Sequence, residues 1–397
     1  MNNIERFIEY AKIDTQADDT TGTSPSTEKQ KNLGRLLVKQ LKELGLDDAF
    51  MDEYGIVYAH LKGEGDKIGF NAHIDTALEV TNTGTNPQIH RNFDGSDIKL
   101  NDQYSLTISQ FPSLKKHIGH DLVTTDGNTL LGADDKAGIA IIMSALEYLV
   151  SHPEIKHHNL SIAFTCDEEI GQGPDHFDLK KMDADYAFTI DGSDIDAIDY
   201  ENFNAHGVHV HIKGVSVHPG EGKNALINAL LILNELINKF PPRETPFDAG
   251  EDDGYWHINN ISGSSDECEM DMITRDFDID KLNKRADDIR NAVKELQEKY
   301  PKATIDLEIR TQYLNMKPYV DKNPKAVEVA KKALIANGLT PKSTKIRGGT
   351  DGATFSKMGL ITPNLGTGSY NHHGRFEYLD IQEFEKMIQV VLEIMKV

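Results

Sequence analysis

Short apolar runs that end in acidic residues constrain the fold of this chain more than any other feature. Residues 160–165 lead directly into the acidic residues of 166–169, and residues 186–190 lead into Asp191. Runs of this length bounded by polar residues indicate buried strands. Helical periodicity alternates with them, which predicts an α/β sheet. Because open α/β sheets build their sites at the carboxyl ends of their strands, we expect a functional site at that edge.

The hydrophobic pattern predicts a sequence of elements along the whole chain. Helices are expected over residues 3–12, 27–45, 137–150, 224–239, 281–300, 324–337 and 381–396. Strands are expected near residues 54–61, 67–72, 160–165, 186–190, 208–212, 256–262, 267–276 and 304–310. The polar segment 76–131, rich in Gly, Asn and Asp, predicts loops and hairpins instead of helix.

Two domains are expected, because 397 residues exceed what one hydrophobic core normally holds. Residues 205–316 show a β-α-β-β-α-β order, which is typical of the ferredoxin-like unit and can be inserted into another domain. The predicted fold class is therefore α/β, with a mixed, mostly parallel sheet between helices. Residues 1–204 and 317–397 form this main domain, and a smaller ferredoxin-like α+β domain interrupts it.

Composition excludes several classes of partner. A net charge of −22 argues against nucleic acid and anionic membranes, both of which need clustered Lys and Arg. The sequence contains no run of 18 apolar residues, so we expect no membrane span, and the N-terminus lacks the pattern of a signal peptide. Cys166 and Cys268 give no disulfide framework and fit a reducing cytoplasm. Cys166 is better explained as a small buried side chain than as a nucleophile.

His73 and Asp75 are the first candidates for a metal site. They stand two residues apart at the end of a predicted strand, so their side chains point the same way. His73 can bind a metal through one ring nitrogen while Asp75 accepts a hydrogen bond from the other. Such a pair also occurs as an ordinary surface pair. Mixed His and carboxylate ligands suit zinc, cobalt or manganese.

Asp134 and Asp135 stand at a loop-to-helix junction, where an acid can serve as a helix cap or as a ligand. The capping interpretation competes well for Asp135, whereas the other candidates favour Asp134 as a ligand shared by two metals. The consecutive acids of residues 167–169 would raise one another's pKa unless a cation lies between them. Near the C-terminus, either His372 or His373 fits a ligand by residue type alone.

His209 and His211 form a second strand pair. No carboxylates accompany them in the sequence, so we interpret them as ordinary residues of a strand surface.

Taken together, these motifs resemble the dizinc exopeptidases related to carboxypeptidase G2 and the aminoacylases, and within them the peptidase T family of tripeptide aminopeptidases. The long gap between Asp75 and Asp134 is similar to that family, and the resemblance covers nearly the whole chain. Further motifs that look like those of the family are Val217-His218-Pro219-Gly220, Arg275-Asp276-Phe277-Asp278, Arg347-Gly348-Gly349-Thr350-Asp351-Gly352 and Pro363-Asn364-Leu365. One departure is Phe376, where members often have a second His.

The resemblance implies a role for each candidate ligand. Asp134 would bridge two metals, because the bridging acid of the family stands two residues before the Lys, and the peptide bond after it is cis in the family. His73 and Asp191 would complete one metal site. Glu169 and His373 would complete the other, because the His before the glycine is the ligand in relatives. The expected cofactor is two Zn²⁺ per subunit, with Co²⁺ or Mn²⁺ as substitutes.

Glu168 and Asp75 would have supporting roles by the same resemblance. Glu168 would be the general base and Asp75 would orient His73. Four carboxylates then balance the charge of two divalent cations, namely those of Asp134, Glu168, Glu169 and Asp191.

The implied activity is hydrolysis of the first peptide bond of tripeptides, so short peptides are the expected partners. His218 of the inserted lid domain would help to hold the oxyanion. In relatives this His can come from the partner subunit, which is compatible with a homodimer formed through that domain. Arg275 and Arg347 are candidates for binding the peptide carboxylate. The alternatives are a dipeptidase, a carboxypeptidase or an N-acyl amino acid deacylase of the same fold, and a non-catalytic peptide-binding protein.

Overall fold

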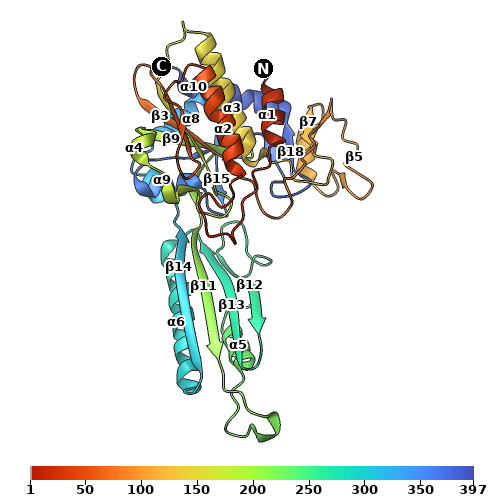
Figure 1. Ribbon diagram of the computed structural model, residues 1–397, viewed down its shortest axis with the longest axis vertical. Coiled ribbons are helices and arrows are strands. Elements are labelled where there is room, and N and C mark those ends of the chain that lie inside the picture. The colour runs from red at the N-terminus through yellow and green to blue at the C-terminus, as the bar shows by residue number, and fades with distance from the viewer. Residues whose placement is uncertain (1) are drawn as a thin grey trace. The chain divides into compact units, whose positions relative to one another are not determined.

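The computed structural model describes residues 2–397 and divides into two compact units (Figure 1). Of the described residues, the first unit contains 2–200, 316–345 and 350–397, and the second contains 201–315 and 346–349. The segment Ile346–Gly349, which the sequence assigned to the larger domain, thus belongs to the second unit. The reason is local: the Phe203 N–H donates to the Ile346 carbonyl (3.1 Å), and the Arg347 guanidinium packs over the Phe203 ring.

The first unit is built on an eight-stranded mixed sheet with the order β1-β2-β8-β3-β9-β16-β10-β15. Its central strands β8 (Asn159–Thr165), β3 (Lys67–His73), β9 (Tyr186–Gly192) and β16 (Asn364–Gly366) run parallel. Antiparallel strands flank them, namely β1 (Phe50–Met51), β2 (Val57–Leu61) and β10 (Ala197–Asn202), and β15 (Lys342–Ile346) ends the order. The predicted fold class is therefore confirmed.

Helices cover the sheet. The long helix α3 (Ala133–Ser151) packs against β3 and β9, and most of its side chains are buried because its sequence is apolar on nearly every face. Against α3 pack α1 (Asn3–Ala11) and α10 (Ile381–Met395), while α8 (Lys325–Ala336) packs on α10. A separate apolar cluster joins Tyr58, Ala163 and Ala187 of the sheet to Phe355 of α9 (Asp351–Met358) and Met182 of α4 (Leu179–Met182). Two further helices are α2 (Gln30–Glu43), which packs on β1 and β2, and α7 (Lys317–Val320).

The segment predicted as loops and hairpins forms a small subdomain of the first unit. Its elements are β4 (Gln88–His90), β5 (Ile98–Lys99), β6 (Ser105–Leu106), the 3-10 helix η1 (Pro112–His117) and β7 (Leu122–Thr124). Two C-terminal strands, β17 (Ser369–Tyr370) and β18 (Tyr378–Asp380), complete the sheet β17-β18-β7-β4. Residues distant in sequence thus share one apolar cluster, which includes Leu114, Tyr370 and Tyr378. The prediction missed the helical turn of η1.

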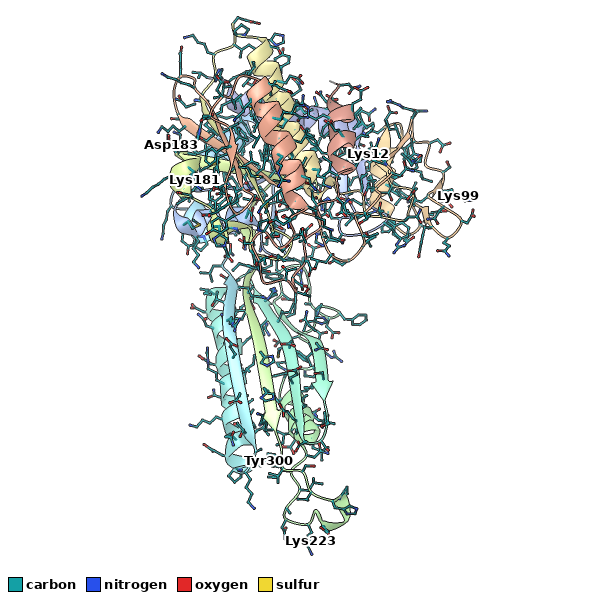
Figure 2. The ribbon with its side chains drawn as sticks, in the orientation of Figure 1. Lys12, Lys99, Lys181, Asp183, Lys223 and Tyr300 are labelled. Atoms are coloured by element: carbon teal, nitrogen blue, oxygen red, sulfur yellow. The ribbon has the colours of Figure 1, made fainter. Side chains whose placement is uncertain are left out.

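The second unit has the predicted β-α-β-β-α-β order. Its elements are β11 (Asn204–Lys213), α5 (Ala229–Ile237), β12 (Tyr255–Gly263), β13 (Glu267–Asp276), α6 (Ile279–Lys299) and β14 (Thr304–Tyr313), with a short η3 (Pro219–Glu221) before α5. The strands form an antiparallel sheet with the order β12-β13-β11-β14. At the end of α6, the Tyr300 hydroxyl (labelled in Figure 2) donates to Glu235 of α5 (2.6 Å).

Alternation along β11 follows the predicted pattern, with Val208 and Val210 in the apolar cluster below the two helices. The expectation that no carboxylates accompany His209 and His211 is wrong. The neighbouring strand β13 brings Asp271 within 2.7 Å of His209 and Glu267 within 2.7 Å of His211. Cross-strand neighbours are not adjacent in sequence, which is why the sequence did not reveal them.

Both cysteines, Cys166 and Cys268, are buried and free, and burial raises the pKa of the Cys166 thiol well above its ordinary value. This environment fits the interpretation of Cys166 as a small buried side chain. Across residues 2–397, no helix has the length and apolar character that crossing a membrane requires.

Candidate metal centre

Two groups of potential metal ligands in the first unit share Asp134. In one group, His73 Nε2 lies 2.9 Å from Asp134 Oδ1 and 3.5 Å from Asp191 Oδ1. In the other group, His373 Nε2 lies 3.4 Å from Asp134 Oδ2 and 3.0 Å from Glu169 Oε2. Within each group the ligand atoms all lie within 4.8 Å of one another. The two oxygens of Asp134 therefore face two different groups, which is the arrangement that a bridging carboxylate needs.

The parallel strands explain why these residues meet. His73 ends β3, Glu169 follows the end of β8, and Asp191 lies near the end of β9. Since β3 pairs in parallel with both β8 and β9, the carboxyl ends of all three strands lie at one edge of the sheet. Asp134 comes from the start of α3, and His373 comes from the loop between β17 and β18, where its φ is +61°. The structure thus brings all five predicted ligands together.

Asp135 lies outside both ligand groups, although it follows Asp134 directly. Its buried carboxylate accepts hydrogen bonds from the His73 N–H (3.1 Å) and the Gly138 N–H (3.2 Å). The peptide bond between Asp134 and Asp135 is cis, as the resemblance implied. Gly138 permits the close packing here, because a Cβ at that position would lie 1.9 Å from the Ile190 carbonyl oxygen. Asp135 therefore holds the first turn of α3 against the end of β3.

Asp75 contacts the acidic pair more directly than it contacts His73. Its two carboxylate oxygens accept the backbone N–H groups of Glu168 and Glu169, each at 3.1 Å. His73 Nδ1 lies 3.2 Å from the Asp75 carbonyl oxygen and 3.4 Å from Asp75 Oδ1. The carbonyl and the carboxylate of Asp75 both lie close enough to fix the ring of His73. The hydrogen bonds that the carboxylate accepts, however, come from the backbone of Glu168 and Glu169.

Asp167 does not join the other acids, so the expectation of three mutually repelling carboxylates is wrong. Its φ of +63° turns the side chain towards the N-terminal segment. There it accepts hydrogen bonds from the Ser26 N–H (2.7 Å) and from Gln30 Nε2 (2.6 Å). Burial raises the pKa of Asp167 above its ordinary value, and these donors partly offset that effect. Asp167 anchors the loop instead of adding charge to the site.

The electrostatics of the site favour the binding of positive charge. Burial, with the neighbouring Asp134 carboxylate, raises the pKa values of Glu169 and Asp191 to about 7 each. Burial also raises the pKa of Glu168 well above its ordinary value. Hydrogen bonds to Asp134 and Glu169 raise the pKa of His373 to about 12. Without a cation, the site therefore compensates its carboxylates by binding protons.

The donor set fits divalent cations. Each ligand group offers one imidazole nitrogen and carboxylate oxygens, a combination that zinc and related metals accept. Glu169 Oε1 is buried and has no hydrogen-bond partner, so its lone pairs are free to coordinate. A buried oxygen without a partner is costly unless a cation or another donor contacts it.

Glu377 positions the loop of the bridging acid, through contacts that the sequence did not specify. Its buried carboxylate accepts the N–H groups of Leu131 (2.8 Å), Gly132 (2.7 Å) and Asp134 (2.9 Å). It therefore fixes the loop that carries the bridging acid. The only sequence signal was a single acid between the aromatic residues Phe376 and Tyr378, because its partners lie more than 240 positions away.

Asp351 is a second residue of this kind. It is buried, and its Oδ2 accepts a hydrogen bond from Thr165 Oγ1 (2.6 Å), the last residue of β8. Burial raises the pKa of Asp351 to about 6. Its place in the Gly-rich motif was noted from the sequence, but its contact with the strand that leads to Glu168 could not be predicted.

Residue type alone did not decide whether His372 or His373 is the ligand, and in the structure both contact Asp134. His372 Nδ1 lies 3.3 Å from Asp134 Oδ2, while its Nε2 is engaged with Ser369 Oγ at 2.8 Å. His373 instead directs Nε2 at both Asp134 and Glu169, and only His373 belongs to a ligand group. Phe376, the departure noted above, packs against Phe111 in the small subdomain (ring centroids 5.2 Å apart).

The three residues predicted to contact substrate, His218, Arg275 and Arg347, belong to the second unit. His218 is exposed, and its Nδ1 accepts a hydrogen bond from the Gly220 N–H (3.2 Å). Arg275 is buried, and its Nη1 donates to the carbonyl oxygens of His206 (3.2 Å) and Thr274 (3.0 Å). Arg347 Nη1 donates to two carbonyl oxygens of the loop that precedes β12. Their predicted contacts with substrate stay predictions.

Comparison with known proteins agrees with the geometry. The model of Peptidase family M20/M25/M40 matches residues 122–397. Peptidase T of Clostridium perfringens (strain 13 / Type A) is 45% identical over 397 residues, which cover 99% of this chain and 98% of that protein. Peptidase T of Bacillus subtilis (strain 168) is 45% identical over 399 residues, with coverage of 99% and 97%.

Solved structures share the fold. The crystal structure of aminopeptidase PepT from Bacillus cereus superposes with a TM-score of 0.78 at 22% identity, covering 99% of this chain and 97% of that one. A Bacillus subtilis protein described as a dinuclear metal binding peptidase from the M20 family gives a TM-score of 0.65 at 14% identity, with coverage of 99% and 96%.

Proposed function

Because this chain belongs to peptidase family M20/M25/M40 and is an enzyme that hydrolyses peptide bonds, we propose that it is a two-metal aminopeptidase that removes the N-terminal residue from tripeptides. The observation that carries this proposal is Asp134, whose two oxygens face two separate groups of ligands. The substrate class is supported by relatives named Peptidase T at 45% identity over nearly the full chain.

Two metal ions are the proposed cofactor, with zinc as the native metal. His73, Asp134 and Asp191 would hold one ion, and Asp134, Glu169 and His373 would hold the other. When bound, the two cations supply Lewis-acid chemistry that polarises the scissile carbonyl and makes a water molecule more acidic. Mixed imidazole and carboxylate donors support zinc, and cobalt or manganese would also be accepted.

Glu168 is the proposed general base. It takes a proton from the attacking water and delivers it to the leaving amine, so that one carboxylate acts in both halves of the reaction. Asp75 holds the Glu168 backbone N–H at 3.1 Å and thus positions this side chain. Because burial raises the pKa of the Glu168 carboxyl, its carboxylate is a stronger base than an exposed one.

His218 is proposed to stabilise the oxyanion. Its Nδ1 accepts the Gly220 N–H, so the hydrogen of the neutral ring sits on Nε2, which can donate to a developing negative charge. We further propose that the chain forms a homodimer through the second unit. We place the enzyme in the cytoplasm, in line with two free cysteines.

Arg275 and Arg347 are proposed to bind the C-terminal carboxylate of the peptide and so to select its length. A guanidinium has five N–H donors, and the contacts described above engage only Nη1 of each residue. If the clamp is correct, Arg275→Ala reduces the preference for tripeptides over tetrapeptides. An unchanged preference would remove Arg275 from the proposal.

A panel of peptides tests the proposed function. The purified enzyme, with and without added zinc, is given di-, tri- and tetra-alanine, together with N-acetylated and C-amidated trialanine. We expect zinc-dependent release of free alanine from trialanine, no reaction after acetylation, and slower reaction after amidation. Release of alanine from acetylated trialanine would favour a carboxypeptidase, and release of acetate would favour a deacylase. A preference for dialanine would favour a dipeptidase.

A further inference from the structure

A third group of potential metal ligands lies outside the two-metal centre, at the base of the small subdomain. The Nδ1 atoms of His117 and His120 lie 2.8 Å and 2.6 Å from the same oxygen, Oδ2 of Asp380. The ligand atoms of these three residues all lie within 4.8 Å of one another. His117 and Asp380 are fully buried, whereas the His120 side chain is 36% exposed. None of the three belongs to the two groups around Asp134.

Glu383 does not belong to this group of three, but its carboxylate lies next to it and is the candidate for a fourth ligand. Its Oε1 lies 3.8 Å from His117 Nδ1, while its Oε2 accepts a hydrogen bond from the Tyr370 hydroxyl (2.6 Å). The Tyr370 hydroxyl therefore holds Oε2 and leaves Oε1 on the side of His117, in the way that outer hydrogen bonds orient metal ligands. Two nitrogens and two carboxylate oxygens make a complete set for a tetrahedral ion.

We propose that His117, His120, Asp380 and Glu383 bind a third divalent transition metal, of the class of Zn²⁺, Co²⁺ or Ni²⁺. Imidazole nitrogens select these ions over Mg²⁺ and Ca²⁺, which prefer oxygen ligands alone. The ion takes the place of the Nδ1 hydrogens that now face Asp380, and each neutral ring then carries its one hydrogen on Nε2. Ligand atoms around a tetrahedral Zn²⁺ are held about 2.0–2.2 Å from the ion, so the nitrogens move apart from Oδ2 by a fraction of an ångström. The exposed side of His120 provides the entry path.

The proposed ion connects segments that are far apart in the sequence. His117 ends η1, and His120 lies in the turn before β7. Asp380 ends β18, where it pairs with Leu122 of β7, and its Oδ1 accepts the Glu383 N–H (2.9 Å) at the first turn of α10. The same sheet contains β17, and the loop from β17 to β18 carries His373. A metal here would tie the small subdomain to the frame of that loop, so its role is structural.

Counting bound metal tests the proposal. Metal-free protein is loaded with excess Zn²⁺ in the presence of millimolar Mg²⁺, unbound ions are removed by gel filtration, and zinc per chain is measured by mass spectrometry. We expect three zinc ions per chain for the wild type and one fewer for His120→Gln. Because His120 is partly exposed, this variant should fold normally. The matched control is His60→Gln, since His60 pairs with Asp48 at 2.7 Å and no third His, Cys, Asp or Glu of residues 2–397 forms a ligand group with them.

The difference between the two variants decides the result, whatever the occupancy of the two-metal centre. If that centre stayed empty, the counts would be one for the wild type and none for His120→Gln. Equal counts for the wild type and His120→Gln would overturn the proposal. A second variant, Glu383→Gln, should retain the protein fold and bind the third zinc at least 10-fold more weakly in a competition with a chelator. Loading with Co²⁺ adds an independent readout, because the third ion should contribute its own visible absorption band that His120→Gln lacks.

Discussion

The first unit gathers imidazoles and carboxylates in two places, and the charge of the two places is balanced differently. Around Asp134, burial raises the pKa values of Glu169 and Asp191 to about 7, and Glu169 Oε1 has no hydrogen-bond partner. At Asp380, by contrast, Oδ2 receives two imidazoles and Oδ1 receives a backbone N–H. The comparison teaches that crowded carboxylates favour a cation around Asp134, whereas the Asp380 carboxylate already has donors on both oxygens, and only the buried Nε2 of His117 lacks a partner there among the described residues.

The largest expected effect is a loss of turnover without a loss of metal at the centre around Asp134. Glu168 is half-buried beside the ligands but belongs to neither group of Asp134. Glu168→Gln should lower kcat by about 10²–10⁴-fold, because a general base is lost, and should leave the zinc content of the two-metal centre unchanged. Steady-state kinetics on a tripeptide and a zinc determination measure both. The control is Glu393→Gln, since Glu393 is an exposed acid of α10 that pairs with Lys396 just after the helix. Loss of zinc in Glu168→Gln would make Glu168 a ligand instead.

Metal removal is the next largest effect, and its pH dependence follows from the pKa shifts. In the metal-free protein, Glu169 and Asp191 have pKa values of about 7, above their ordinary values of 4.5 and 3.8. Between these limits the folded state binds more protons than the unfolded state, so stability falls as pH rises from about 4 to about 7. With zinc bound, deprotonated ligands are favoured and the trend reverses.

The melting temperature should therefore differ between zinc-loaded and metal-free protein by only a few degrees at pH 5 and by more at pH 7. Saturation of one site at 100 times its Kd contributes about 2.7 kcal/mol, so a shift of several degrees is expected at neutral pH. Thermal unfolding at pH 5, 6 and 7, with chelator or with zinc, measures this gap. A gap that narrowed as pH rose would contradict the charge imbalance assigned to the first place.

Three of the five candidate ligands could be located from the sequence because they stand at the ends of strands, whereas the choice of Asp134 and His373 came from the family resemblance. His73, Glu169 and Asp191 each follow an apolar run, and parallel pairing of β3 with β8 and β9 brings such ends together. The alternation of Val208 and Val210 with polar residues likewise predicted the buried and solvent-facing sides of β11. In both cases a local pattern carries the information, because strand periodicity and strand ends are visible in neighbouring residues.

Other parts could not be predicted because their partners are distant. The strand β15 has the polar sequence Lys-Ser-Thr-Lys-Ile, and β16 has three residues that are strand only through pairing with β9 and β10. The sequence placed Asp167 in a run of acids, yet its carboxylate contacts Ser26, which lies 141 positions earlier in the chain. The helix α5 begins at Ala229, not near 224, since the Asn228 side chain caps it.

Glu377 tests how far the first place depends on its surroundings. Glu377→Gln replaces a carboxylate that accepts three N–H groups by an amide whose NH₂ cannot accept. We expect a loss of about 1–3 kcal/mol in the free energy of unfolding and a zinc affinity about 10–100-fold weaker, because the loop that carries Asp134 is less well held. Urea denaturation and a chelator competition measure the two effects. Unchanged zinc affinity would show that Asp134 is held by its metals alone.

The smallest expected effect compares the same His–Asp contact in a buried and in an exposed setting. His117 and His60 make the same contact, Nδ1 to an aspartate Oδ2, at 2.8 Å and 2.7 Å. The pair of His117 with Asp380 is fully buried, whereas the side chains of His60 and Asp48 are 34% and 52% exposed. His60→Gln should change the free energy of unfolding by less than about 1 kcal/mol, because water replaces the lost partner. His117→Gln should cost about 1–3 kcal/mol, because a buried carboxylate loses a donor. Urea denaturation in chelator, which removes any metal contribution, compares the two variants. Equal changes in the free energy of unfolding would mean that Asp380 finds a replacement donor. The His117 imidazole would then contribute little to the stability of this cluster.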